Sequence, residues 1–174
     1  MLNFALEGDA LDNYNKMVEE LKRKAMSELG LLASEIVVRP LRPEDMGFST
    51  PQWTKTVAWS GTNAWNKIVN TVTVADNRFI GINGVHRGTG QGTTTQFTQL
   101  RVTRSGKLAR YWNIQAVEDF IGNSQYFNDY ITVDQNNQLT VEGYALATTV
   151  TEKMVFLGAV AEKRGLVLNP NLEV

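Results

Sequence analysis

Hydrophobic and polar positions follow a helical period near the N-terminus of the chain. From Tyr14 to Leu32, apolar residues recur three or four positions apart, while acidic and basic residues fill the opposite side. This spacing predicts an amphipathic helix of about six turns or fewer within residues 9–34. Asp9 or Asp12 is expected to cap the start of this helix, and Gly30 is a stop signal that the apolar pattern can run past.

Beyond the helix, the pattern changes to short alternating runs. Residues 35–51 hold three of the four prolines, which predicts one short extended piece followed by a rigid connector. From residue 52 to residue 165, apolar and polar positions alternate in short segments that are separated by turn residues. Because no second long helix interrupts these segments, a parallel α/β sheet is disfavoured.

The fold class that follows is all-β. We expect residues 1–174 to form one domain, a single jelly-roll β-barrel or sandwich of 8–9 antiparallel strands with one N-terminal amphipathic α-helix. Its expected parts are a helical N-terminal arm (1–34), a proline-rich connector (35–51), the barrel (52–165) and a C-terminal tail (166–174).

Turn residues refine the prediction within the barrel. One hairpin is expected around Asp76 and Asn77, and another around residues 104–107. A short helical turn is expected within residues 116–122, and a break near residues 151–153 is expected to separate the last two strands.

Composition restricts the possible chemistry. The chain has 174 residues, of which 43% are hydrophobic and 20% are charged, as in ordinary globular proteins. The absence of cysteine excludes disulfides, thiolate zinc sites and cysteine nucleophiles. No signal peptide or membrane anchor is visible, since no stretch approaches the roughly 20 apolar residues that span a bilayer.

Charge is distributed unevenly along the chain. The net charge of -1 argues against strong nucleic-acid binding through a globally basic surface. Residues 48–115, however, carry eight Lys and Arg against one Asp. Two interpretations remain open: this segment forms a basic patch for an acidic partner or anionic surface, or its neighbours in space neutralise it.

A glycine-rich stretch, "HRGTGQGTTTQ" at residues 86–96, invites comparison with phosphate-binding loops. A Walker loop needs a lysine after its last glycine, but Thr93 follows Gly92. A dinucleotide-binding loop needs a following helix, whereas the residues after this loop are rich in β-branched side chains. We therefore interpret the Gly88–Gly92 region as a connection between two strands.

Candidate catalytic and metal-binding residues are few. His86 is the only histidine, so a metal site of the cupin type, which needs several histidines, is not expected. Four acids near predicted strand ends are formal candidates for paired-carboxylate hydrolysis. These acids are Asp119, Asp129, Asp134 and Glu142. Scattered acids on a β-protein are usually solvated, so we predict no catalytic residue, no metal and no cofactor.

Aromatic residues offer a further candidate site. They fit a platform on which sugars stack, or alternatively the hydrophobic core, which is favoured for Trp53 and Trp59 because they share a face with Val57. The residues concerned are Trp53, Trp59, Trp65, Trp112, Tyr111, Tyr126 and Tyr130. A non-catalytic carbohydrate-binding β-sandwich is therefore the alternative function.

Two longer stretches carry a family resemblance. They are "VVRPLRPEDMGFSTPQWTKTVAW" (37–59) and "LTVEGYALATTVTEKMVFLGAVAEKRGLVLNP" (139–170). Together with the size and the N-terminal helix, they resemble the smaller of the two single-β-barrel major capsid proteins of tailless, membrane-containing icosahedral viruses of Thermus and haloarchaea. The near-neutral charge favours the bacterial branch of that group.

The resemblance implies a structural virion protein, made in the host cytoplasm, without catalysis. Its expected partners are itself, as a dimer or higher homo-oligomer, and a second, larger capsid protein, in a shell over a lipid membrane. Anionic lipid head groups are a further candidate partner for the basic middle segment, and specific nucleic-acid binding is not expected.

The apolar stripe of the predicted helix packs either on its own barrel or on a neighbouring subunit. The helix and the C-terminal tail are the sequence candidates for arms that contact another subunit. The candidate interface residues are Tyr14, Met17, Val18, Leu21, Met26, Leu29, Leu166 and Leu168.

Overall fold

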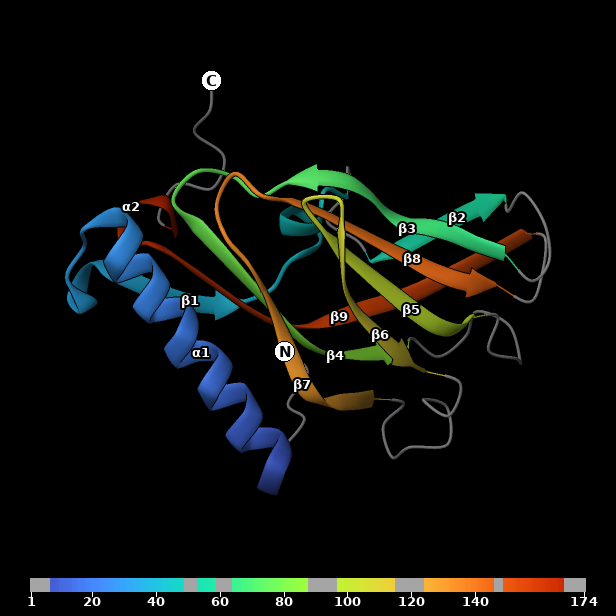
Figure 1. Cartoon of the computed structure of the whole chain (residues 1–174), viewed down its shortest axis with the longest axis horizontal. Helices are drawn as coiled ribbons and strands as arrows, with labels where there is room; N and C mark the ends of the chain where they lie inside the picture. The colour runs from blue at the N-terminus through green and yellow to red at the C-terminus, as the bar shows by residue number, and fades with distance from the viewer. Residues whose placement is uncertain are drawn as a thin grey trace.

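The structure is a computed structural model that describes residues 7–48, 53–58, 64–87, 97–114, 124–145 and 149–167. It is mostly β, with two antiparallel sheets and one long helix, α1 (Gly8–Leu29). In Figure 1, α1 lies beside β1 (Ile36–Pro40), β4 (Arg78–Arg87) and β7 (Ser124–Val133), at one end of the molecule. The strands that make most of the contacts with α1 all belong to the first sheet, so the layers run helix, first sheet, second sheet.

Each sheet is assembled from strands that are distant in the sequence. The first sheet has the order β1 (Ile36–Pro40), β9 (Thr149–Lys163), β4 (Arg78–Arg87), β7 (Ser124–Val133), and β2 (Thr54–Ala58) also pairs with β9. The second sheet has the order β3 (Ala64–Thr73), β8 (Gln138–Ala145), β5 (Phe97–Arg104), β6 (Lys107–Asn113). Three short helices complete the described elements: η1 (Ala33–Glu35), η2 (Pro43–Met46) and α2 (Arg164–Val167).

The strand pairs are nested along the chain. Strand β5 pairs with β6, β4 with β7, β3 with β8, and β2 with β9, so that each pair encloses the previous one. Two further pairings, β4 with β9 and β5 with β8, join these pairs side by side. The described strands therefore form one long antiparallel ribbon that is folded over into two sheets.

The main hydrophobic core lies between the two sheets. Strand β8 shows the alternation clearly: Leu139, Val141 and Ala145 are fully buried, whereas Thr140 and Glu142 are only partly buried. The first sheet contributes Phe156 and other inward side chains to the same core. The alternation of apolar and polar residues in the sequence thus corresponds to one face against the core and one face towards solvent.

A second hydrophobic cluster holds α1 on the outer face of the first sheet. Met17, Leu21 and Ala25 are fully buried there, against residues that include Phe79 and Ala159. Gly81 of β4 lies directly beneath the helix, because a Cβ atom added at Gly81 would come 2.6 Å from the Met17 sulfur. A glycine at this position therefore permits the close approach of helix and sheet.

Polar contacts reinforce the same packing along one side of α1. The Lys24 ammonium lies 2.6 Å from the Asp134 carboxylate, and Asn13 donates a hydrogen bond of 2.9 Å to the Phe127 carbonyl. Tyr130 donates a hydrogen bond of 2.8 Å to the Glu20 carboxylate. Burial alone would raise the pKa of Glu20, but the hydrogen bonds from Tyr130 and Thr132 and the charge of Lys24 lower it below its usual value.

The ends of α1 agree only partly with the sequence predictions. Gly30 ends the helix in a left-handed conformation with φ of 64°, which confirms it as the stop. The predicted cap was wrong: Glu7 is the N-cap residue and makes no capping hydrogen bond with its side chain, while Asp9 lies in the first turn. There the negative charge of Asp9 still interacts favourably with the positive, N-terminal end of the helix dipole.

One predicted hairpin is confirmed and the other was wrong. Strands β5 and β6 form a hairpin whose two turn residues, Ser105 and Gly106, have φ of 47° and 77°. The turn at Asn77, with φ of 61°, instead carries the chain from β3 in one sheet to β4 in the other. Asparagine tolerates this conformation in either kind of connection, so the local sequence does not distinguish them.

The remaining local predictions concern β1, β9 and two loop segments. The short extended piece expected before the connector is β1, which pairs with β9. The break expected near residues 151–153 was wrong, because β9 continues through these residues while they pair with β2. The helical turn expected within 116–122 lies outside the described residues, as does most of the glycine-rich loop, 88–96.

A buried ion network fixes β1 to its neighbours. The Arg39 guanidinium donates to Asp45 at 2.6 and 2.7 Å and to Glu162 at 2.6 Å. Glu162, which is 1% exposed, also accepts a hydrogen bond of 2.8 Å from Arg78 of β4. Burial alone would lower the pKa of Arg39, but the hydrogen bonds to Asp45 and Glu162 and their charges raise it above its usual value.

Replacing Arg39 with methionine is expected to destabilise the fold strongly. The change Arg39→Met removes the guanidinium that the buried Asp45 carboxylate shares with Glu162 and leaves Glu162 with Arg78 alone, which should lower the free energy of unfolding by about 3–5 kcal/mol. Urea denaturation measures this loss. Arg110→Met is the control, because Arg110 pairs with Asp129 at the exposed surface and its loss should cost less than about 1 kcal/mol. Equal denaturation midpoints for the two variants would contradict the assigned role of the network.

A second prediction concerns the contact between β4 and β9. A Cβ atom added at Gly158 would lie 1.9 Å from the Gly81 carbonyl oxygen, so Gly158→Ala forces the two central strands apart. We expect a loss of about 3 kcal/mol in the free energy of unfolding, measured by thermal or urea denaturation. Gly165→Ala is the control, since a Cβ atom there meets no atom within 4 Å. A Gly158→Ala variant as stable as this control would show that the strands are not held this closely.

Candidate functional site

Most of the candidate interface residues on α1 pack on the chain itself. Met17 and Leu21 are fully buried against the first sheet, and Tyr14, Val18 and Leu29 are partly buried around them. Of the two alternatives for the apolar stripe, the structure thus has the packing within the chain, on the first sheet, and residues 8–29 are not a detached arm. The physical reason is that Phe79, Ala159 and Ala161 give the first sheet an apolar outer face. A neighbouring subunit would reach these side chains only if α1 left its sheet.

The other candidate interface residues lie elsewhere. Met26 faces away from the sheet and is 41% exposed. Leu166 falls within α2, but its side chain and all of Leu168 lie outside the described residues.

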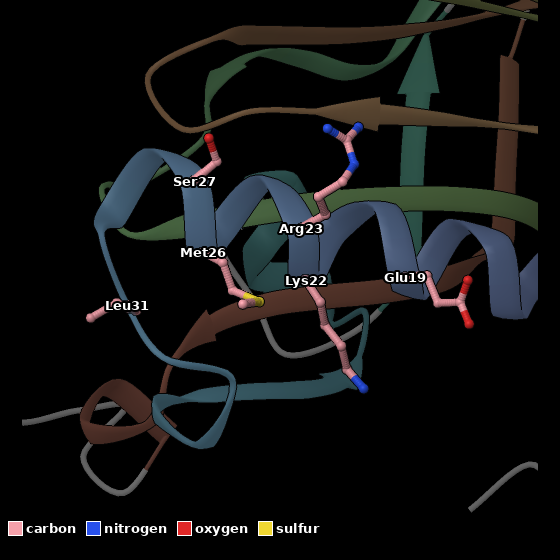
Figure 2. Close-up of a pocket in the computed structure, with 6 residues that line it drawn as sticks. All are labelled: Glu19, Lys22, Arg23, Met26, Ser27 and Leu31. Atoms are coloured by element: carbon pink, nitrogen blue, oxygen red, sulfur yellow. The ribbon is translucent and has the colours of Figure 1, made fainter.

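Met26 belongs to a surface pocket on the outer side of α1. The pocket has a volume of about 490 Å³ and is bordered by Met26 and Leu31, with Glu19, Lys22, Arg23 and Ser27. Figure 2 shows Met26 and Leu31 at the C-terminal end of the helix and the two cations one turn earlier. We call this feature the α1 pocket. Its apolar centre and mixed charges suit a protein contact better than a small charged ligand.

A second, more polar pocket lies where α1 approaches the turn between β5 and β6. It has a volume of about 520 Å³, and Lys24, Arg104, Lys107 and Asp134 are among its lining residues. Lys24 is engaged with Asp134, and Arg104 donates a hydrogen bond of 2.8 Å to the Thr132 carbonyl. Two of the three cations are therefore held by internal contacts.

The structure also shows how the basic middle segment is balanced. Arg78 pairs with Glu162, Arg101 with Glu142, and Arg110 with Asp129, so three cations of residues 48–115 meet acids of residues 116–174. This favours the interpretation in which neighbours in space neutralise the segment. Among the described residues, no carboxylate lies within ion-pair distance of Lys67, Lys107 or Arg104, and Arg104 is held by the Thr132 carbonyl instead.

An aromatic cluster covers the outer face of the second sheet. Trp65 of β3 stands opposite Tyr144 of β8, and their ring centroids are 5.4 Å apart. The Trp65 ring also reaches Tyr111 of β6 at 5.7 Å, and the Arg101 guanidinium lies 4.6 Å from the Trp65 ring centroid. Arg101 is fixed in turn by Glu142, which accepts a hydrogen bond of 2.7 Å from its Nε. We call this set of five residues the aromatic face.

The remaining tryptophans do not take part in the aromatic face. Trp53 packs at the edge of the core, 5.9 Å from Phe156. Trp112 is buried and stacks on Phe127, with 4.1 Å between the ring centroids. It also donates a hydrogen bond of 2.9 Å to the Asp129 carboxylate. Trp59 lies outside the described residues.

The predicted sugar platform is thus only partly assembled by the fold. The structure brings Trp65 and Tyr111 together, whereas Tyr126 and Tyr130 belong to β7 of the other sheet. Tyr144 is not among the candidates that the sequence pattern indicated. Tyr144 follows Thr140 and Glu142 at alternate positions of β8, and its place opposite Trp65 becomes visible only when the pairing of β3 with β8 is known.

The candidate catalytic residues are dispersed. His86 Nδ1 lies 2.9 Å from the Ser124 hydroxyl on the neighbouring strand β7. Asp129, Asp134 and Glu142 are engaged with Arg110, Lys24 and Arg101 respectively, and Asp119 lies outside the described residues. The described residues contain no group of three His, Cys, Asp or Glu side chains that would hold a metal ion.

Neither the described helices nor comparisons with known proteins point to a particular function. Among the described helices, none has the length and apolar character that a membrane crossing requires. No protein-family profile matches the sequence, and no curated protein is significantly similar to it.

Proposed function

We propose that the fold is a jelly roll and that the chain is a structural subunit of an icosahedral virus shell. The observation that carries the proposal is the nested order of the strand pairs, with β5 and β6 innermost and β2 and β9 outermost. A jelly roll is a double-sheet arrangement of eight strands in two Greek keys. Strands β2 to β9 supply these eight, and β1 extends the first sheet beside β9.

Three kinds of protein commonly use this fold: viral capsid proteins, lectins and cupins. Cupin metal centres need several histidines, and the sequence has one. The capsid function is favoured over the lectin function by the resemblance of residues 37–59 and 139–170 to the smaller capsid protein of membrane-containing icosahedral viruses. In that role the subunit self-associates and joins a larger capsid protein over a lipid membrane, and no catalysis is assigned to it.

Shell assembly requires surfaces that bind other subunits. The α1 pocket supplies one such surface, because Met26 and Leu31 form an apolar centre with Lys22, Arg23 and Glu19 around it. Leu32, which follows directly, is 69% exposed. Apolar side chains surrounded by polar groups are typical of protein interfaces. Since α1 is fixed on the sheet by Met17 and Leu21, it presents this surface as a rigid element.

Self-association through the α1 pocket is directly testable. We expect the purified protein to form a defined oligomer, and Met26→Asp to weaken its self-association about tenfold or more, because a carboxylate would be buried at the contact. Sedimentation velocity over a range of concentrations measures the effect.

Leu11→Asp is the matched control. Leu11 lies on the same helix with 39% exposure, close to the 41% of Met26, but it does not border the pocket. A monomeric wild-type protein at every concentration would count against a shell subunit. Equal behaviour of the two variants would remove the α1 pocket as the interface.

A further inference from the structure

We infer that the aromatic face is a binding site for acidic carbohydrate. The face is built by all four strands of the second sheet, on the side away from the core: Trp65 from β3, Tyr144 and Glu142 from β8, Arg101 from β5 and Tyr111 from β6. The inference does not depend on shell assembly, since it concerns the opposite side of the molecule from α1.

The aromatic rings of this face are not needed by the core. The core beneath them is filled by Leu100, Val141 and other inward residues, which are fully buried. Tyr111 is 53% exposed, and Trp65 and Tyr144 are partly exposed. Solvent-exposed aromatic rings bind the apolar faces of sugar rings, and polar groups beside them bind the sugar hydroxyls.

The polar groups next to the rings are held in place before any ligand arrives. Glu142 and Arg101 stand opposite each other on neighbouring strands and form an ion pair at 2.7 Å. The Arg101 guanidinium also contacts the Trp65 ring. Because these contacts already hold both side chains, each of them loses less entropy on binding a ligand than an unpaired surface side chain would. Remaining donor and acceptor positions on the two groups are suited to sugar hydroxyls.

Charge identifies the class of sugar. Lys67 of β3 also stands opposite Glu142, but the Glu142 carboxylate is engaged by Arg101, and Lys67 has no acidic partner in the described part of the chain. Lys67, Glu142 and Arg101 lie side by side across β3, β8 and β5. The two cations and the one carboxylate leave an excess of one positive charge. A carboxylated sugar, such as a uronic acid, complements that excess, whereas a neutral sugar supplies no charge that would pair with Lys67.

The same residues disfavour a nucleic acid. Single-stranded nucleic acid needs a track of cations along its phosphates in addition to stacking rings. Here a carboxylate, Glu142, lies between the two cations and would repel the phosphates. The geometry therefore favours an acidic glycan, in which carboxylates are spaced by neutral hydroxyl groups.

Binding can be tested by isothermal titration calorimetry with oligogalacturonate. A neutral galactose oligosaccharide of the same length and an oligo-dT strand serve as comparison ligands. We expect saturable binding of oligogalacturonate that weakens as salt is added, weaker binding of the neutral sugar, and none of oligo-dT.

Two variants assign the binding to the aromatic face. Tyr111→Ala removes an exposed ring and should weaken the binding of both sugars by up to about tenfold. Lys67→Gln should weaken the binding of oligogalacturonate about threefold while leaving the neutral sugar unchanged. Leu108→Ala is the control, because Leu108 lies on β6 with 52% exposure and belongs to no ring contact of the face. Circular dichroism of each variant shows that it is folded.

Several results would overturn the inference. Absence of saturable sugar binding, binding of oligo-dT as tight as that of oligogalacturonate, or an equal effect of Leu108→Ala and Tyr111→Ala would each do so. If Tyr111→Ala changes the oligomeric state and not sugar binding, the face is an interface between subunits instead. Because Met26→Asp tests assembly on the other side of the molecule, failure of one proposal is distinguishable from failure of the other.

Discussion

The pairing of β9 with β4 is the interaction on which the rest of the structure depends. Strand β9 also pairs with β1 and β2. Without its pairing to β4, the first sheet would separate into two parts, one with β1, β2 and β9 and one with β4 and β7. Its two faces serve two cores: Phe156 and Val160 face the second sheet, while Ala159 and Ala161 receive α1. Two glycines permit this double role: Gly158 lets β9 lie close to β4, and Gly81 lets α1 lie close to β4, so that both sets of side chains are buried.

Polar interactions arrange the surface around this framework. The Arg39 network joins β1, η2 and β9, which closes one end of the first sheet. On the other sheet, the Arg101 and Glu142 pair holds the Trp65 ring against its neighbours. Both arrangements bring an arginine to an acid that is far away in the sequence. The uneven distribution of charge along the chain therefore becomes balanced only in the folded protein.

The sequence predicted the elements better than their partners. The period of Tyr14 to Leu29 identified the helix, and the residues before Gly106 identified its hairpin, because both signals are local. The connection at Asn77 could not be assigned, since the same left-handed turn serves a hairpin and a crossing between sheets. For the same reason, Trp65 and Tyr111 were recognised as candidates for a platform, but Tyr144, placed by the register of β3 with β8, was not.

The nested strand order also has a consequence for how the chain folds during synthesis. Strand β9, the centre of the first sheet, is made after all of the strands that it joins. Until it leaves the ribosome, the outer surface that receives Met17 and Leu21 is incomplete, because α1 has only β4, β7 and a β1 that still lacks its pairing strand to pack on. Such long-range pairing is slow to form and leaves apolar edges exposed in the meantime. Efficient production of this protein thus depends on protecting a half-built sheet, a demand set by the order of its strands and not by its final stability.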